Sequence, residues 1–201
     1  ANLVAAIASS GSEGTSSNGS PVDAWRTVTL KDPFYLMYRS VETDEGLGGS
    51  GKCVSIQLST ADKAKKTTTS RMKYRDPKTK LLTEKTVCTK AVPSADDAIR
   101  MGDGENCDAA ETTQVRFAYS DYGTCDVTVV GTVETKCELW VKEGYQQLPE
   151  VNEDAVASRA DTSVNENIAK CKKVYDEQCK GPKKYQIYEK NTCSSLTTSS
   201  K

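Results

Sequence analysis

The sequence of 201 residues contains no histidine, and this absence excludes several kinds of active site. Ser-His-Asp and Cys-His nucleophilic machinery and histidine-based zinc sites all require an imidazole. The cysteines include no C-x-x-C pair, which also argues against zinc and redox chemistry. We therefore expect no metal and no cofactor. Any catalysis would have to depend on a carboxylate pair, a lysine or a tyrosine.

Long apolar runs and an excess of one charge are also missing. No stretch of about 18 or more apolar residues occurs, so no membrane-spanning helix is predicted. Lysine and arginine together number 27 and aspartate and glutamate 28, which gives a formal net charge of −1. This balance predicts neither a nucleic-acid partner nor attraction to an anionic membrane.

Cysteine, by contrast, is plentiful, with eight residues in the chain. Eight cysteines without metal-type spacing predict a disulfide framework formed in an oxidising compartment, so we expect a secreted, extracellular protein. The first nine residues, apolar and then small, resemble the end of a secretory signal. The length suits a single domain, which we expect to act as a monomer.

The chain divides into three parts by composition. Residues 1–20 are expected to be a signal remnant and flexible leader, because the Ser- and Gly-rich stretch buries too little apolar surface to order. Asn18 there begins an N-x-S sequon, so a glycan is expected on it. Residues 21–193 form the folded domain, and residues 194–201 are a flexible polar tail.

Eight short segments have the composition and alternation of β-strands, separated by Gly-, Pro- and Asp-containing turns. They are residues 34–41, 52–58, 67–75, 81–88, 98–101, 113–120, 125–130 and 137–141.

The last two of these segments form a predicted hairpin with an unusual repetition. Each arm begins with a cysteine followed by a carboxylate, Cys125-Asp126 and Cys137-Glu138. Successive strand side chains point to opposite faces, so one member of each pair can fasten the outside while the other faces the interior.

Helical signals flank the strands. Asp23 is a predicted N-cap for a short helix, and Trp25 is expected to close the base of a barrel rather than contact a ligand. A second helix is predicted from the apolar spacing between Val164 and Tyr175, and Gly181-Pro182 ends it. The fold class is therefore all-β with flanking helices: an eight-stranded antiparallel up-and-down barrel with a C-terminal α-helix outside. Such a barrel can hold one small ligand.

Six elements in order resemble the tick salivary lipocalins of the histamine-binding type, over about residues 21–193. The motifs are Asp23-Ala24-Trp25-Arg26, Tyr35-Leu36-Met37-Tyr38-Arg39-Ser40, Cys53-Val54, Ala118-Tyr119-Ser120-Asp121, Cys125-Asp126-Val127 and Cys137-Glu138-Leu139-Trp140. The resemblance implies a lipocalin that sequesters a mediator of host inflammation inside its barrel.

The resemblance also implies ligand-binding residues, since the family often keeps two carboxylate-lined amine sites in one barrel. One site maps to Asp32, Asp126, Glu138 and Trp140. The other maps to Glu84 and Asp44, with partners at Val41, Ile99, Met101, Thr113 and Val115 that are no longer aromatic or acidic. This second site has therefore lost its aromatic cage, which leaves room for a more apolar ligand.

Other interpretations of the same residues stay open. Asp126 and Glu138 could pair with basic side chains on the outer wall, and Glu84 could lie on a solvated strand face. Tyr38 is a further candidate ligand contact, although alternating tyrosines are more often core and rim packing. If Asp126 and Glu138 lie close together inside the barrel, their repulsion should raise the pKa of at least one.

Four cysteines can be paired by analogy with the family, as Cys53–Cys193 and Cys125–Cys171. The other four allow three pairings, of which we favour Cys88–Cys107 with Cys137–Cys179.

Three functions compete. The first is sequestration of a cationic amine such as histamine or serotonin, and the second is binding of an apolar mediator such as a leukotriene, fatty acid or sterol. The third is inhibition of complement or another host plasma protein through the loops at 42–51 and 91–113. An enzyme is not expected, because two carboxylates could hydrolyse glycosides only in a long open cleft that the sequence does not suggest.

Overall fold

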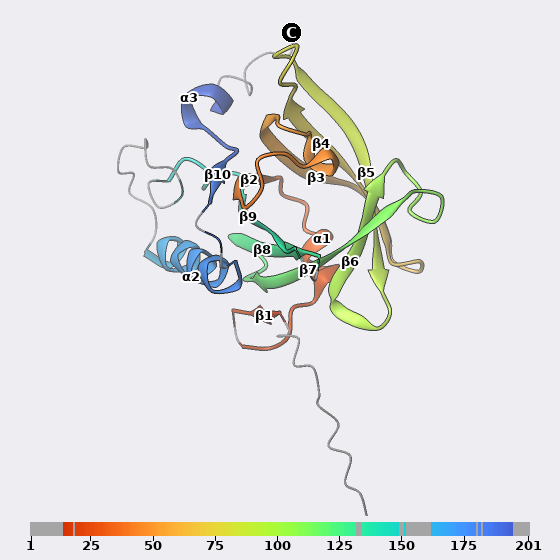
Figure 1. Ribbon diagram of the computed structural model, residues 1–201. Helices are drawn as coiled ribbons and strands as arrows, with labels where there is room; N and C mark the ends of the chain where they lie inside the picture. The colour runs from red at the N-terminus through yellow and green to blue at the C-terminus, as the bar shows by residue number, and fades with distance from the viewer. Residues whose placement is uncertain are drawn as a thin grey trace, which may run out of the picture.

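The computed structural model describes residues 14–17, 19–131, 134–148, 151, 162–179, 181 and 183–194. Its centre is an antiparallel β-barrel with a long helix, α2 (Thr162–Gln178), packed outside over β7, β8 and β9 (Figure 1). The barrel strands are β2 (Phe34–Arg39), β3 (Lys52–Asp62), β4 (Thr67–Arg75), β5 (Leu82–Val92), β6 (Ala95–Asp103), β7 (Thr112–Ser120), β8 (Cys125–Val130) and β9 (Lys136–Lys142).

Each strand from β2 to β9 pairs antiparallel with the next, and β9 pairs with β2 to close the barrel. The predicted eight-stranded up-and-down barrel is confirmed. The largest differences from the predicted strands are at β3, β5 and β6, which all run longer; β5 and β6 form a tight hairpin across residues 93 and 94. Short elements complete the chain: β1 (Thr15–Ser16), α1 (Ala24–Val28), η1 (Glu45–Leu47), β10 (Tyr185–Gln186) and α3 (Lys190–Cys193).

The β8–β9 hairpin separates two cores by the alternation of its side chains. Val127 and Leu139 point outward and pack with Ile168 and Tyr175 of α2. Trp140 points inward and packs with other interior residues. Because both faces of the hairpin are covered, nearly all of its side chains are buried, including polar ones.

The disulfides fasten the barrel to the C-terminal segment. The structure contains Cys53–Cys193, Cys88–Cys107, Cys125–Cys171 and Cys137–Cys179, the same four pairings that were expected. The bonds from Cys125 and Cys137 place both cysteines on the outer face of the hairpin, toward α2. Each bond restricts the unfolded chain and contributes about 2–4 kcal/mol.

Part of the segment expected to be a flexible leader is built into the sheet. Residues Thr15 and Ser16 form β1, which pairs in parallel with Tyr119 and Ser120 of β7. The pairing covers the edge of β7 that β6 leaves open, since β6 pairs with β7 only as far as Arg116. Unpaired backbone groups at a strand edge are costly to bury, which explains why this polar segment is ordered.

Gly14→Ala should detach this N-terminal strand. A Cβ at Gly14 would lie 1.8 Å from the carbonyl oxygen of Phe117, and the neighbour is backbone that cannot move aside. We expect a loss of about 1–3 kcal/mol in the free energy of unfolding, measured by chemical denaturation. Gly123→Ala is the matched control, because a methyl group there meets no described atom within 4 Å. Equal stability of the two variants would contradict the prediction.

Trp25, which was expected to close the base of the barrel, is only half-buried and is not part of the buried cluster next to α1. Val22 and Ala24 are fully buried in this cluster, together with Phe117. Asp23 caps α1 as predicted, accepting a hydrogen bond from the Arg26 amide. The cap fixes the phase of this short helix so that Trp25 stays half-buried, with the Lys66 Nζ 5.0 Å from its ring centroid.

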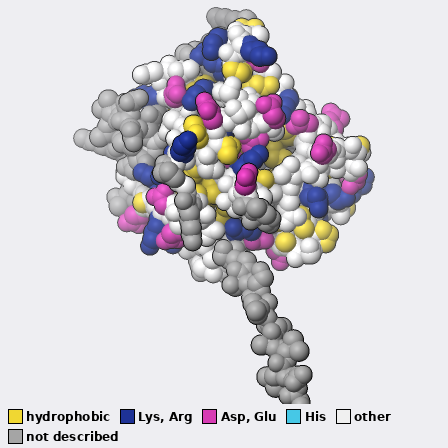
Figure 2. All heavy atoms as spheres, in the orientation of Figure 1, with side chains coloured by type: hydrophobic (Ala, Val, Ile, Leu, Met, Phe, Trp, Pro, Cys, Tyr) yellow, Lys and Arg dark blue, Asp and Glu magenta, His cyan; other side chains and the backbone are white. Residues whose placement is uncertain are grey.

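Asn18 and the polar tail from residue 195 onward lie outside the described residues. No helix in the described ranges is long and apolar enough to cross a membrane. Basic and acidic side chains intermingle over the face of the molecule seen in Figure 2, as the balanced composition predicts.

Candidate functional site

The barrel encloses a cavity of about 500 Å³. Every strand from β2 to β9 contributes side chains to its wall, as do α1 and the loop that carries η1. Most of the wall is aliphatic or aromatic, and a few polar groups interrupt it. This is the usual composition of a small-molecule pocket, and the volume lies within the range of about 300–1,000 Å³ that such pockets occupy.

Asp126 is one of two carboxylates buried in this wall, and its residue is only 5% exposed. The Ser120 hydroxyl donates a hydrogen bond of 2.5 Å to its Oδ1. Burial raises the pKa of Asp126 to about 7; the Ser120 hydrogen bond opposes the rise, and the nearby charge of Asp121 adds to it. Near neutral pH this carboxyl group is therefore divided between its protonated and ionised forms.

Glu138 is the second buried carboxylate, with 4% exposure. Burial raises its pKa to about 8, and the charge of Asp44 contributes further. A hydrogen bond from Thr128 and the charges of Arg39 and Lys136 act in the opposite direction. The Thr128 hydroxyl also accepts a hydrogen bond of 3.3 Å from the Trp140 indole N–H, so Trp140, Thr128 and Glu138 form one chain of hydrogen bonds.

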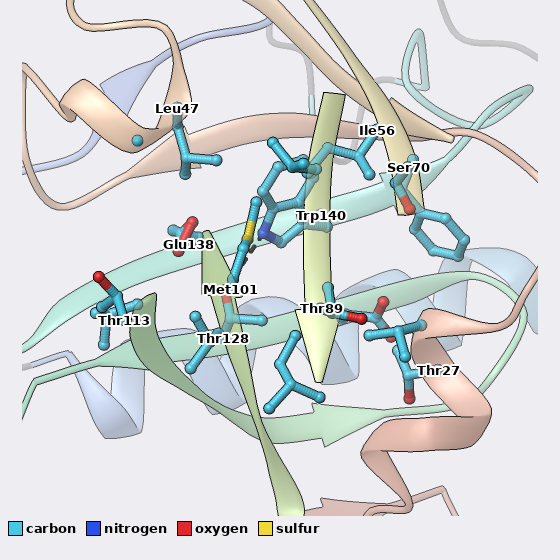
Figure 3. Close-up of a pocket in the computed structure, with 18 of the residues that line it drawn as sticks. Thr27, Leu47, Ile56, Ser70, Thr89, Met101, Thr113, Thr128, Glu138 and Trp140 are labelled. Carbon is cyan, nitrogen blue, oxygen red and sulfur yellow. Dashed lines mark hydrogen bonds between the residues drawn. The ribbon is translucent and has the colours of Figure 1, made fainter. Parts of the chain in front are cut away.

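The register of β8 and β9 places the side chains of Asp126, Thr128, Glu138 and Trp140 at the four corners of a square. Asp126 lies opposite Trp140, and Thr128 lies opposite Glu138. The two carboxylates are therefore diagonal, and a different neighbouring charge acts on each, Asp121 on one and Asp44 on the other. Burial raises both pKa values, so the repulsion expected between the two acids is not the cause. In Figure 3 the Trp140 ring lies in the middle of the cavity, between Glu138 and the side where Ser70 and Thr27 lie.

Arg39 holds the loop at one end of the cavity. Its side chain is fully buried, and it lies opposite Glu138 in the β2–β9 ladder. The guanidinium donates to four main-chain carbonyl oxygens of the loop: Val41 (2.9 Å), Glu42 (2.9 Å), Leu47 (3.5 Å) and Gly49 (2.7 Å). The same loop brings Asp44 and Leu47 into the cavity wall.

Five of the seven candidate ligand-binding residues line this cavity: Asp32, Asp44, Asp126, Glu138 and Trp140. Asp32 is at the rim, where its half-exposed carboxylate is 4.0 Å from the Lys142 ammonium group. Positions expected for the second amine site also share the cavity, namely Ile99, Met101, Thr113 and Val115. The cavity wall therefore includes the residues of the first expected site and part of the second, without Glu84 and Val41.

Glu84 and Tyr38 are not among the residues of the cavity wall. The Glu84 carboxylate lies on the outside of β5, where it forms a 2.5 Å ion pair with Arg71 of β4 and stays nearly half exposed. Tyr38 packs edge-on against Tyr175 of α2 with ring centroids 4.8 Å apart. A register shift in β2 between Leu36 and Tyr38 turns Tyr38 toward the helix, and this irregularity leaves no mark in the sequence.

Sequence reasoning missed five residues that act on the buried carboxylates: Thr128, Lys136, Arg39, Ser120 and Asp121. The first two have a signal, because they stand two residues from Asp126 and Glu138 and therefore share their face. Arg39 has no local signal, since only the pairing of β2 with β9 brings it near Glu138. Among the described residues, no group of three or more Cys, Asp or Glu side chains is placed to hold a metal ion.

Comparison with known families agrees with this arrangement of barrel and cavity. The family model of tick histamine binding proteins matches residues 12–195. The chain belongs to this family. The barrel with its outer helix is therefore the fold of a tick lipocalin.

Two solved crustacyanin structures show the same fold as this family member at low identity, and a third structure, an amine binding protein, aligns less well. Apocrustacyanin C1 is 9% identical, with 86% of this chain and 83% of that chain covered and a TM-score of 0.57. Apocrustacyanin C2 is also 9% identical, with 87% and 83% covered and a TM-score of 0.56. A tryptamine complex of the amine binding protein of Rhodnius prolixus is 13% identical, with 87% and 90% covered and a TM-score of 0.46. The comparison with curated proteins gave no match.

Proposed function

We propose that this tick lipocalin is secreted and sequesters a small cationic amine of the host, such as histamine or serotonin, inside its barrel. The observation that carries the proposal is the pair of buried carboxylates, Asp126 and Glu138, on the same inner face as Trp140. The family's name, histamine binding, supports the same class of ligand. Four disulfides are consistent with an extracellular protein.

The physical chemistry of an ammonium ion explains why these groups suit it. An isolated cation loses a large hydration free energy when it enters an apolar cavity, so it needs ionised partners inside. Charge-assisted hydrogen bonds to a carboxylate are roughly twice as strong as neutral ones. The Trp140 ring can add about 0.5–2 kcal/mol of cation–π attraction. Burying two carboxylates without a ligand is costly, and a bound cation offsets that cost.

Calorimetric titration with histamine and serotonin tests the proposal. We expect saturable binding by the wild-type protein and by Glu84→Gln, since Glu84 lies outside the cavity in an ion pair with Arg71. Glu138→Gln, the same chemical change inside the cavity, should weaken binding of both amines. If neither amine gives a detectable heat of binding at high micromolar concentration, the proposal is contradicted.

Amine affinity should rise with pH between about 6 and 8.5. The protein must lose a proton from each carboxyl group that pairs with the ammonium ion, and the pKa values of Asp126 and Glu138 are about 7 and about 8. Below these values the affinity should fall about tenfold per pH unit for each proton displaced. Serotonin is a suitable probe, because its ammonium group stays charged over this range. An affinity independent of pH, with no proton release on binding, would contradict the prediction.

An apolar mediator is the second candidate, and the aliphatic wall favours it. Ile99, Met101 and Val115 line the part of the cavity where the family's second site is expected to be aromatic and acidic. A fatty-acid derivative or sterol would bury against such a wall at about 25 cal/mol per Å² of apolar surface. Native mass spectrometry of freshly purified protein should then show co-purified lipid. A mass of the protein alone and no lipid uptake would remove this candidate.

A further inference from the structure

The charge of the cavity differs from that of the whole protein. The chain is nearly neutral at −1, yet six acidic side chains and a single lysine, Lys136, contribute to the cavity wall. Two of the acids have basic partners at the rim, Asp32 with Lys142 and Asp103 with Lys85. Counted against Lys136, Lys142 and Lys85, the six acids leave three negative charges when all are ionised, and a monoamine matches only one of these.

The two buried acids lie in separate surroundings. Asp126 has Ser120 as its hydrogen-bond partner, and Asp121 is the charge that acts on it. Glu138 shares its surroundings with Asp44, Arg39 and Lys136. A ligand with a single ammonium group can therefore pair with only one of these two buried acids.

The space between the two acids is suited to methylene groups. Trp140 stands opposite Asp126, and its ring lies in the middle of the cavity (Figure 3). The aliphatic side chains of Val87 and Met101 belong to the same wall and pack with Trp140 in one cluster. Diagonal positions on adjacent strands are roughly 7–8 Å apart, a separation that about four to six methylene groups can span.

We propose that the cavity takes one elongated ligand with an ammonium group at each end, an aliphatic α,ω-diamine. One ammonium group binds Asp126, the other binds Glu138 beside Asp44, and the methylene chain crosses the Trp140 ring. This inference rests on the proposed amine binding and names the class of amine.

A diamine gains from the arrangement because its second contact is intramolecular. Once one ammonium group is bound, the linked group is present at the other acid at a high effective concentration. When both ammonium groups are buried, each of the two carboxyl groups, Asp126 and Glu138, can ionise beside a cation. The cavity of about 500 Å³ has room for a ligand of this length.

Titration of the wild-type protein with a series of diamines, from 1,3-diaminopropane to 1,8-diaminooctane, tests the inference at pH 8. Butylamine is the monoamine control. We expect one diamine per protein, an optimum at four to six methylene groups, and an affinity at least tenfold above that of butylamine. Asp126→Asn and Glu138→Gln should each reduce the best diamine to the affinity of butylamine, and Glu84→Gln should leave it unchanged.

The outcomes separate this inference from the proposed function. If butylamine, histamine or serotonin binds but no diamine binds more tightly than butylamine, the bridging ligand is overturned and amine binding stands. Two diamines per protein would also overturn it, because each acid would then hold its own ligand. If no amine of either kind binds, both proposals fall.

Discussion

Asp126→Asn should weaken amine binding about 100-fold and at the same time make the ligand-free protein more stable at pH 8. The loss of binding follows from removing one member of a buried, hydrogen-bonded charge pair, which costs about 2–5 kcal/mol. The gain in stability follows from the pKa of Asp126, which burial raises from 3.8 to about 7. An amide has nearly the same shape and can still accept the hydrogen bond from Ser120.

The direction of the stability change follows from proton binding. Above pH 4 the unfolded chain has lost the Asp126 proton, while the folded protein keeps it up to about pH 7. Between pH 4 and pH 7 the chain must therefore take up a proton on Asp126 when it folds. Above pH 7 the folded protein must instead bury an ionised carboxylate. The wild type is penalised increasingly from pH 4 to pH 7 and by a constant amount above it. The full penalty is on the order of 4 kcal/mol, because the pKa rises from 3.8 to about 7 and each pKa unit corresponds to about 1.4 kcal/mol.

Denaturation of the wild type and Asp126→Asn at several pH values checks this prediction. The two proteins should be about equally stable near pH 4, and the variant should become progressively more stable up to about pH 7. Asp96→Asn is the matched control, because Asp96 is exposed on β6. The difference in stability between this variant and the wild type should not change with pH. A variant that is less stable than the wild type at pH 8 would show that the carboxylate stabilises the fold.

Arg39→Ala should destabilise the protein by about 3–5 kcal/mol, the largest loss expected from a single side chain here. The guanidinium is fully buried, and its four hydrogen bonds go to carbonyl oxygens of one loop. Each carbonyl left without a partner in the interior costs about 1–3 kcal/mol, unless the loop opens to water. Opening would carry Asp44 and Leu47 away from the cavity and remove the cation that faces Glu138.

Chemical denaturation measures the loss, and hydrogen exchange of the amides of residues 44–51 reports the opening of the loop. Arg39→Lys should fall between the wild type and Arg39→Ala in stability, because an ammonium group has three donors, one fewer than the four carbonyl oxygens require. Arg71→Ala is the matched control: its ion pair with Glu84 is half exposed, so its loss should cost less than about 1 kcal/mol. Similar stability of Arg39→Ala and Arg71→Ala would refute the anchoring role.

The sequence predicted the barrel well because its strongest signals are local. Alternation along the strand from Cys125 to Val130 assigns Asp126 to one face and its neighbours to the other, whatever the rest of the chain does. Glu84 shows the limit of that signal. Alternation alone leaves open which face is inside, and in the structure the register of β4 and β5 places Glu84 outside, against Arg71.

The errors at the N-terminus have a similar origin. Thr15 and Ser16 have a composition typical of flexible segments, but the open edge of β7 orders them. Trp25 was expected at the base of the barrel because large aromatic residues are usually buried. The phase of α1, set by its cap at Asp23, buries Ala24 in its place.

By itself the sequence determined the class of fold, the disulfide-rich character of the chain and the hairpin that carries Asp126, Glu138 and Trp140. Periodicity and composition are properties of neighbouring residues, so no tertiary information is needed to detect them. Only the tertiary structure decided that both carboxylates share one cavity with Asp44, that burial raises their pKa values, and that Arg39 holds the loop beside Glu138. Burial and charge proximity depend on closing the barrel, which brings together β2 and β9 from distant parts of the chain.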